Sequence, residues 1–138
     1  DTILTEKSLA CKENNIVVSC VADGKGLEFL HPIDLYTIFG NAMDNAIECV
    51  KNLQKQEKRQ IDVLIHRQHQ FLIVQIMNPV EEELEFEDNL PVTTKHDKAY
   101  HGYGLRSIKN SVKKYNGVFQ VKIKDGCFCL KILFPIKE

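Results

Sequence analysis

The sequence lacks several features that would assign it to a large class of proteins. No apolar run approaches the length of a membrane span, and no signal peptide is visible at its start. Its 18 basic and 19 acidic residues leave a net charge of −1, so the charge balance gives no reason to expect binding to nucleic acid or to an anionic membrane. These absences predict an ordinary soluble protein with no nucleic-acid partner and no direct membrane contact.

Paired cysteines are also missing. The five cysteines form an odd set without a Cys-x-x-Cys pair or zinc-like spacing: Cys11, Cys20, Cys49, Cys127 and Cys129. Cys127 and Cys129 alternate along an expected strand, which favours packing over chemistry. We therefore expect reduced cysteines and an intracellular location.

Internal repeats and low-complexity tracts are absent as well. The 138 residues suffice for a single domain, 1–138, with a real hydrophobic core. Because the chain begins at Asp1 rather than at a methionine, we expect it to be a fragment of a larger protein.

What the sequence does contain is a succession of helical and strand patterns. Apolar residues at helical spacing predict helices over 2–14 and 32–56, and a third helix that opens at 101–105 and ends at 116–117. Alternation predicts strands over 16–22, 61–66, 71–77, 118–124 and 127–134, with a hairpin return over 27–30. The strand over 71–77 is apolar on both faces, and is therefore expected at the centre of the sheet.

The long helix carries an unusual polar edge. Asn41, Asn45 and Glu48 fall at i, i+4 and i+7, so three carbonyl-type oxygens share one face beside the apolar core stripe. Asparagine is a poor helix former, because its side chain competes for backbone hydrogen bonds. Taken alone, this edge is either a solvated face or part of a binding site.

A segment over 80–101 shows no periodicity, and loops of this length inside compact domains are usually functional lids or disordered inserts. It ends at Gly102 and Gly104, where glycines at a helix start let unpaired N–H groups approach an anion, or simply close the loop. Four basic side chains that would neutralise a polyphosphate, or lie solvated, surround these glycines: Lys95, Lys98, His101 and Arg106.

Asn78 ends the central strand and would either bond the edge of a nucleobase or cap the turn at Pro79. Two common nucleotide motifs are excluded. The chain has no G-x-x-x-x-G-K-[ST], and its glycines do not form G-x-G-x-x-G after a strand.

The order of these parts resembles the GHKL (HATPase) superfamily, which groups sensor histidine kinases with gyrase-, Hsp90- and MutL-type ATPases. Asn41-Ala-Met-Asp-Asn45-Ala resembles its N-box, and His101-Gly-Tyr-Gly-Leu105 its last glycine box. Three further segments are similar to those of the peptide-pheromone receptor kinases of the AgrC and ComD type and of their citrate-sensor-like relatives. These segments are Asp44 to Glu48, Leu133-Phe-Pro-Ile136 and Asn78.

The resemblance implies an α/β sandwich of the Bergerat type, with a mixed, mostly antiparallel sheet and helices on one face, which binds ATP and Mg²⁺ between helix, sheet edge and lid. Asn45 would coordinate Mg²⁺, and Asn78 would bond adenine. Asn41 stands where hydrolytic members place a glutamate base. Because an amide cannot take a proton from water, this substitution favours transfer to a protein over hydrolysis. The implied nucleotide-binding residues, including backbone amides from 102 to 105, are Asn41, Asn45, Asn78, Lys95, Lys98, His101, Gly102, Tyr103, Gly104 and Leu105.

The chain departs from the family pattern at two places. The first glycine box, an aspartate followed by two spaced glycines, is absent after Asn78, as is characteristic of the pheromone-receptor branch. Glu48 stands where many kinases have a lysine, so no phosphate contact is expected from that position.

The resemblance therefore implies the catalytic domain of a two-component sensor histidine kinase, in the cytoplasmic part of a bacterial membrane receptor. None of the five histidines lies on a dimerising helix, so the acceptor histidine is expected on a separate dimerisation domain, with a response regulator as a further partner. The isolated domain is expected to be monomeric and the full-length receptor a homodimer. Three alternatives stay open: a GHKL serine kinase of the anti-sigma type, a regulatory module that binds nucleotide weakly or not at all, and a structural interaction domain.

Overall fold

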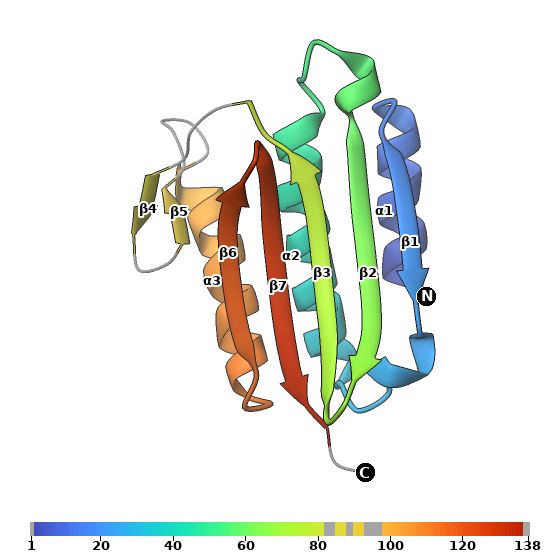
Figure 1. Ribbon diagram of the computed structural model, residues 1–138, viewed down its shortest axis with the longest axis vertical. Coiled ribbons are helices and arrows are strands. Elements are labelled where there is room, and N and C mark those ends of the chain that lie inside the picture. The colour runs from blue at the N-terminus through green and yellow to red at the C-terminus, as the bar shows by residue number, and fades with distance from the viewer. Residues whose placement is uncertain (1, 82–84, 88–89, 93–97, 137–138) are drawn as a thin grey trace.

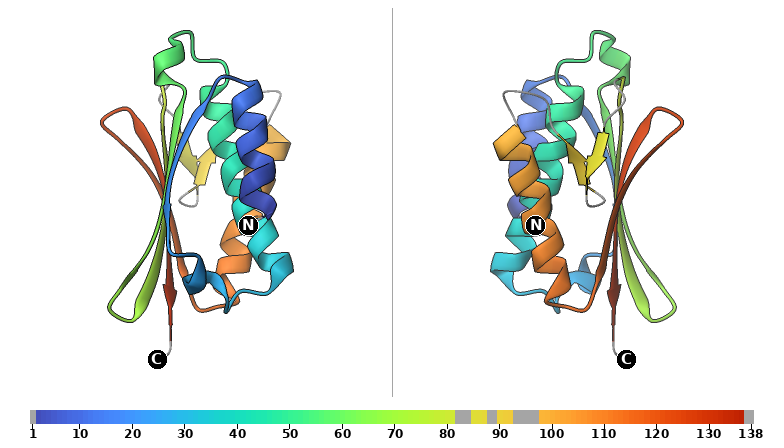
Figure 2. Two further views of the ribbon diagram at one scale, coloured as in Figure 1. Left: turned by 90° about the vertical axis from the view of Figure 1, so that its right-hand side faces the viewer. Right: turned by 90° about the vertical axis from the view of Figure 1, so that its left-hand side faces the viewer.

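A computed structural model describes residues 2–81, 85–87, 90–92 and 98–136. These residues form two layers, a five-stranded sheet and three α-helices that all lie on one of its faces (Figures 1 and 2). The elements are α1 (Thr2–Glu13), β1 (Val17–Ala22), η1 (Gly24–Leu27), α2 (Pro32–Val50), η2 (Gln56–Lys58), β2 (Gln60–Gln68), β3 (Phe71–Pro79), β4 (Glu85–Glu87), β5 (Leu90–Val92), α3 (Lys98–Lys113), β6 (Val118–Lys124) and β7 (Cys127–Pro135). No helix in the described ranges has the length and apolarity needed to cross a membrane.

The sheet has the strand order β1-β2-β3-β7-β6, with β1 parallel to β2 and every other pair antiparallel. This confirms the expected mixed sheet with helices on one face and β3 at its centre. The expected hairpin return over 27–30 is wrong. Since β1 pairs with β2 in parallel, the chain between them must cross over the sheet, and it does so through η1 and α2.

The core lies between α2 and the central strands. On β3, Leu72, Val74 and Ile76 are at most 2% exposed and face the helices. The expectation that β3 is covered on both faces is only partly right, because Phe71 is 45% exposed on the open face of the sheet and Met77 is half-buried there. The sheet therefore keeps one face that no described helix covers (Figure 2).

The long helix begins as the sequence predicts and ends earlier. Pro32 occupies its first turn, and His31 caps it by accepting a hydrogen bond at Nδ1 from the N–H of Ile33. The helix ends at Val50, not near position 56. Leu53 is still buried, because the turn after the helix folds it back onto the core.

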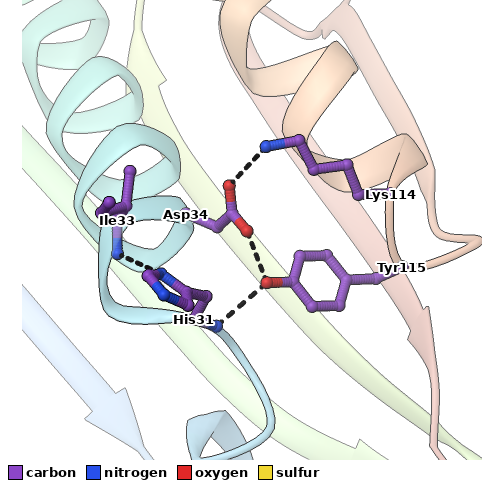
Figure 3. Close-up of polar contacts among 5 residues, drawn as sticks. All are labelled: His31, Ile33, Asp34, Lys114 and Tyr115. Atoms are coloured by element: carbon purple, nitrogen blue, oxygen red, sulfur yellow. Dashed lines mark hydrogen bonds and ion pairs between the residues drawn. The ribbon is translucent and has the colours of Figure 1, made fainter.

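The base of the helix layer is held by the side-chain network of Figure 3. The hydroxyl of Tyr115 donates to Asp34 Oδ2 at 2.6 Å and accepts from the backbone N–H of His31 at 2.9 Å, while Lys114 Nζ lies 3.0 Å from Asp34 Oδ1. These bonds, from Tyr115 first and Lys114 second, hold the pKa of the Asp34 carboxyl below its ordinary value. They fix the start of α2 to the segment that follows α3.

The segment over 80–101 contains more structure than the sequence predicts. β4 and β5 pair as a short antiparallel ribbon, and α3 begins at Lys98. Three-residue strands are too short to show a period in the sequence.

Candidate functional site

The polar edge of α2 runs from the middle of the helix, at Asn41, toward its C-terminal end, and α2 packs against β3 (Figure 1). Asn41 and Asn45 are both half-buried. Asn41 Nδ2 donates to the carbonyl oxygen of Thr37 at 2.8 Å, which leaves Oδ1 free to face α3. The Asn45 amide has no hydrogen-bond partner among the described residues. Asp44 points away from this edge, toward Lys7 on α1, at 2.6 Å.

Gly104 brings α3 against the same edge. A Cβ atom placed at position 104 would lie 3.2 Å from Asn41 Oδ1, closer than side chains normally pack. The two helices therefore approach at this point because residue 104 has no side chain. This contact joins the two sequence motifs in space, a result that neither motif predicts alone.

Asn78 is the most unusual polar residue of the site. It is 2% exposed at the end of β3, and its Nδ2 donates to the carbonyl oxygen of Pro79 at 3.0 Å, which fixes the orientation of the amide. Its Oδ1 is buried without a partner in the described structure. An unpaired buried acceptor costs about 1–3 kcal/mol, so such a group usually has a functional reason.

Cys49 connects the α2 edge to Asn78 and was missed by sequence reasoning. It lies one turn beyond Asn45, so the i+4 spacing that singled out the asparagines also reaches it. Burial raises the pKa of the Cys49 thiol, and the neighbouring Asn78 side chain opposes part of this rise. Cys49 and Asn78 thus lie close together between α2 and β3, and Asn45 precedes Cys49 by one helical turn.

The start of α3 differs from the sequence prediction. The helix begins at Lys98, so Gly102 and Gly104 lie within it and do not precede it. The first-turn amides that lack intrahelical partners are therefore those of residues 98–101, not those of 102–105. Leu105 is 1% exposed and belongs to the core.

The remaining predicted contacts are only partly described. Lys95 lies outside the described residues, and so do the side chains of Lys98, His101 and Tyr103, although their backbone forms the first turns of α3. Arg106 is exposed on α3.

A backbone hydrogen bond fixes the point where the chain leaves β3. Val80 N–H donates to the carbonyl oxygen of Gly126 at 2.8 Å, in the tight turn between β6 and β7. Asp125 and Gly126 both have positive φ, 53° and 73°, as a type I′ turn requires, so the predicted hairpin is confirmed. The end of the central strand is thereby held beside the outermost hairpin.

The polar side chains of this site suit a metal ion that is bound together with a nucleotide better than a metal ion bound by protein side chains alone. In the described ranges no cluster of three His, Cys, Asp or Glu side chains could hold a metal. Amide oxygens such as that of Asn45 are ligands that Mg²⁺ accepts, and Mg²⁺ usually takes most of its ligands from phosphates and water. The unpaired Asn78 Oδ1 is an acceptor suited to an amino group of a planar base.

Comparisons with known proteins agree with this geometry. A protein-family profile described as "GHKL domain" matches residues 30–135. No sequence match to a curated protein was found.

Solved structures of histidine kinases share the fold. The catalytic domain of histidine kinase ThkA superposes with a TM-score of 0.71 at 17% identity, over 97% of this chain and 88% of that chain. The Acinetobacter baumannii histidine kinase AdeS gives a TM-score of 0.63 at 12% identity, over 99% of this chain and 64% of that chain. At such identities these likenesses establish the fold, and they confirm the predicted sandwich.

Proposed function

The chain belongs to the GHKL domain family, and from this premise we propose that it is the ATP-binding catalytic domain of a two-component sensor histidine kinase. It would bind Mg-ATP and transfer the γ-phosphoryl group to a histidine on a separate dimerisation domain, from which a response regulator would receive it. The observation that carries the proposal is the buried, unpaired Oδ1 of Asn78 beside the asparagine edge of α2.

Asn78 would read the base. One N–H of its Nδ2 donates to the Pro79 carbonyl oxygen, and its Oδ1 is a buried acceptor without a partner in the described structure. Adenine presents an amino group that can donate to this oxygen. Guanine presents a carbonyl oxygen at the corresponding position, which would leave two acceptors facing each other, and the site would therefore favour ATP over GTP.

Asn41 and Asn45 would face the triphosphate. Mg²⁺, when bound, would supply charge neutralisation between the phosphates, and we propose that Asn45 contributes one oxygen ligand to it. The amides exposed at the start of α3 would hold phosphate oxygens. Lys95, Lys98, His101, Tyr103 and the backbone of Gly102 and Gly104 are the remaining proposed contacts, whereas the N–H of Leu105 lies within α3 and is not among them.

The chain's own residues favour transfer over hydrolysis. In the transfer, an acceptor histidine nitrogen forms a bond to the γ-phosphorus while the bond to the β–γ bridging oxygen breaks and ADP leaves. Water would need a general base to attack in the same way. The amide of Asn41, bonded to the Thr37 carbonyl, cannot accept a proton. Catalysis by this domain would thus consist of positioning and charge neutralisation.

A second candidate is a regulatory module that binds nucleotide weakly. The missing first glycine box favours it, since Asn78 is followed by Pro79 and Val80 and not by a flexible glycine pair. A GHKL serine kinase of the anti-sigma type would use the same site on a different acceptor.

Calorimetry with Mg²⁺ and a non-hydrolysable ATP analogue tests the proposal. We expect Asn45→Ala to weaken binding of the Mg-nucleotide about tenfold or more, and to change binding of metal-free ADP much less, because only the former uses the metal contact. Asn110→Ala, on the exposed face of α3, is the matched control and should leave both unchanged. Equal losses for both ligands would show that Asn45 is structural. If the wild-type chain bound no nucleotide at millimolar concentration, the kinase hypothesis would be rejected. A structural or regulatory module would then be the remaining interpretation.

A further inference from the structure

The two edges of the sheet differ in how they are protected. β6, at one edge, carries the exposed Lys122 and Lys124, and lysines on an edge strand discourage pairing with another chain. β1, at the other edge, has no charged residue, proline or glycine from Val17 to Ala22. All of its residues except Val18 are exposed, and Val17 and Val21 are each 65% exposed.

β1 also has backbone groups along its outer side that pair with no strand in the described parts of the chain. Val17 N–H donates to the Arg59 carbonyl at 2.9 Å, and Asp23 N–H donates to the Ile65 carbonyl at 3.2 Å. In a parallel ladder alternate residues bond to the neighbouring strand, so the odd-numbered residues face β2. The N–H and C=O groups of 18, 20 and 22 therefore point outward. Figure 2 (left) looks onto this edge, and α1 lies beside it, not over it.

We propose that β1 pairs with β1 of a second copy of this chain, antiparallel about a twofold axis, and joins the two sheets into one. The proposal is independent of the nucleotide site. A second copy fits better than a charged peptide. β1 has no charged residue that could attract such a peptide, and when β1 pairs with β1 of a second copy no charged side chains of the two strands are placed opposite each other. Pairing of β1 with β6 of another copy would set lysines on the interface and would extend without closure.

The outward-pointing groups define the register. If the twofold axis passes beside Cys20, then Cys20 lies opposite Cys20 of the second copy, and Val18 lies opposite Ala22. On the open face of the sheet, Val21 of each copy then covers Ser19 of the other, which removes an exposed valine from water. Cα atoms of such a hydrogen-bonded pair are about 5.5 Å apart, a separation that a direct thiol–thiol link can span.

Light scattering across a range of protein concentrations tests the pairing. We expect the wild-type mass to rise toward twice the 15.9 kDa of one chain, and Cys20→Lys to stay at the single-chain mass, because two lysines would meet at the axis. Cys20→Ser is the matched control and should behave as wild type. Position 20 is exposed, so neither change disturbs the core.

Two further measurements locate the interface. In the wild type, amide exchange at 18, 20 and 22 should slow as concentration rises, while amides that face β2 should not change. A short bismaleimide should yield a covalent dimer in the wild type and none in Cys20→Ser, although four other cysteines remain.

A dimer that persists in Cys20→Lys would overturn the proposal, and so would a wild-type chain that stays monomeric at millimolar concentration. The second result would agree with the sequence-based expectation of a monomer. The edge strand β1 would then be available to pair with a strand from another protein. Nucleotide binding is measured separately and is unaffected by either outcome, so this proposal and the proposed function fail independently.

Discussion

The two ends of the α2–α3 helix pair are built in opposite ways. At the base, every polar group of the network has a partner: Asp34 accepts from Tyr115 and Lys114, and Tyr115 accepts from His31. Three aromatic rings pack edge to face beside it, with centroids 5.3 to 6.0 Å apart: Phe29, Tyr115 and Phe134. The base is closed.

At the upper end, by contrast, some polar groups have no hydrogen-bond partner in the described structure. Asn78 Oδ1 is buried and unpaired, the Asn45 amide has no partner in the described structure, and the helices meet at a glycine. This difference suggests a division of labour, in which the base supplies free energy of folding and the upper end supplies free energy of binding. Changes at the base should therefore affect mainly stability, and changes at the upper end should affect mainly affinity.

The largest expected effect is at the base. Phe134→Ala should lower the free energy of unfolding by about 3–5 kcal/mol, because Phe134 is fully buried and packs against both other rings. Urea unfolding measures it. Phe71→Ala, near the same end of the sheet but 45% exposed, is the control and should lose much less. Similar losses for the two variants would contradict the closed, packed base.

The Asp34 network gives a pH-dependent effect. Asp34→Asn should lower stability at neutral pH by about 1.5–3 kcal/mol, the usual worth of hydrogen bonds to a charged group. Because the folded-state pKa of Asp34 is depressed, its contribution is present above the unfolded pKa, near 3.9, and is lost as pH falls through the folded value. The variant should therefore approach wild type in acid. A constant difference across pH would mean that the carboxylate charge is irrelevant.

At the upper end, Asn78→Ala should change the selectivity of nucleotide binding. Loss of the Oδ1 acceptor should reduce the preference for ATP over GTP about fivefold to tenfold, as measured by competition binding. Asn78→Asp retains an acceptor oxygen and is the matched control. If Asn78→Ala keeps the full preference for ATP over GTP, other residues recognise the nucleobase.

The smallest expected effect on stability comes from replacing either of two helical glycines, which should differ in their effect on nucleotide binding. Gly104→Ala and Gly40→Ala both replace a helical glycine, a change worth up to about 1 kcal/mol in favour of folding. At position 40 the nearest atom to a new Cβ is 3.7 Å away, an ordinary contact, whereas at 104 it is Asn41 Oδ1 at 3.2 Å. We expect neither variant to unfold more easily, and only Gly104→Ala to weaken nucleotide binding. Equal affinities would show that Asn41 can shift without consequence.

Local patterns predicted much of the fold from the sequence. Alternation located β2, β3, β6 and β7, and the His31–Pro32 pair marked the start of α2. Where a long-range pairing decides the structure, prediction failed. Nothing near Gly24 shows that β1 pairs in parallel, and the stripe of α2 continues to Leu53 although a turn, not a helix, buries that residue.

The candidate site divides in the same way. Residue types and spacing identified Asn41, Asn45 and Asn78, because polar groups beside an apolar stripe are visible in the sequence. The approach of Gly104 to Asn41 and of Cys49 to Asn78 depends on how α2 sits against α3 and β3, which no single segment specifies. The earlier start of α3 was missed because its first turn has no apolar stripe.

The hydrogen bond between Val80 and Gly126 has a mechanical consequence. It acts as a fixed pivot, since the chain cannot begin to swing at the end of β3 while Val80 is tied to the β6–β7 turn. Because Val80 comes two residues after Asn78, this bond also couples the β6–β7 turn to the buried amide of the candidate site. A substitution that distorts the turn at Asp125 or Gly126 would therefore reach Asn78 through the backbone, with no side-chain contact between them.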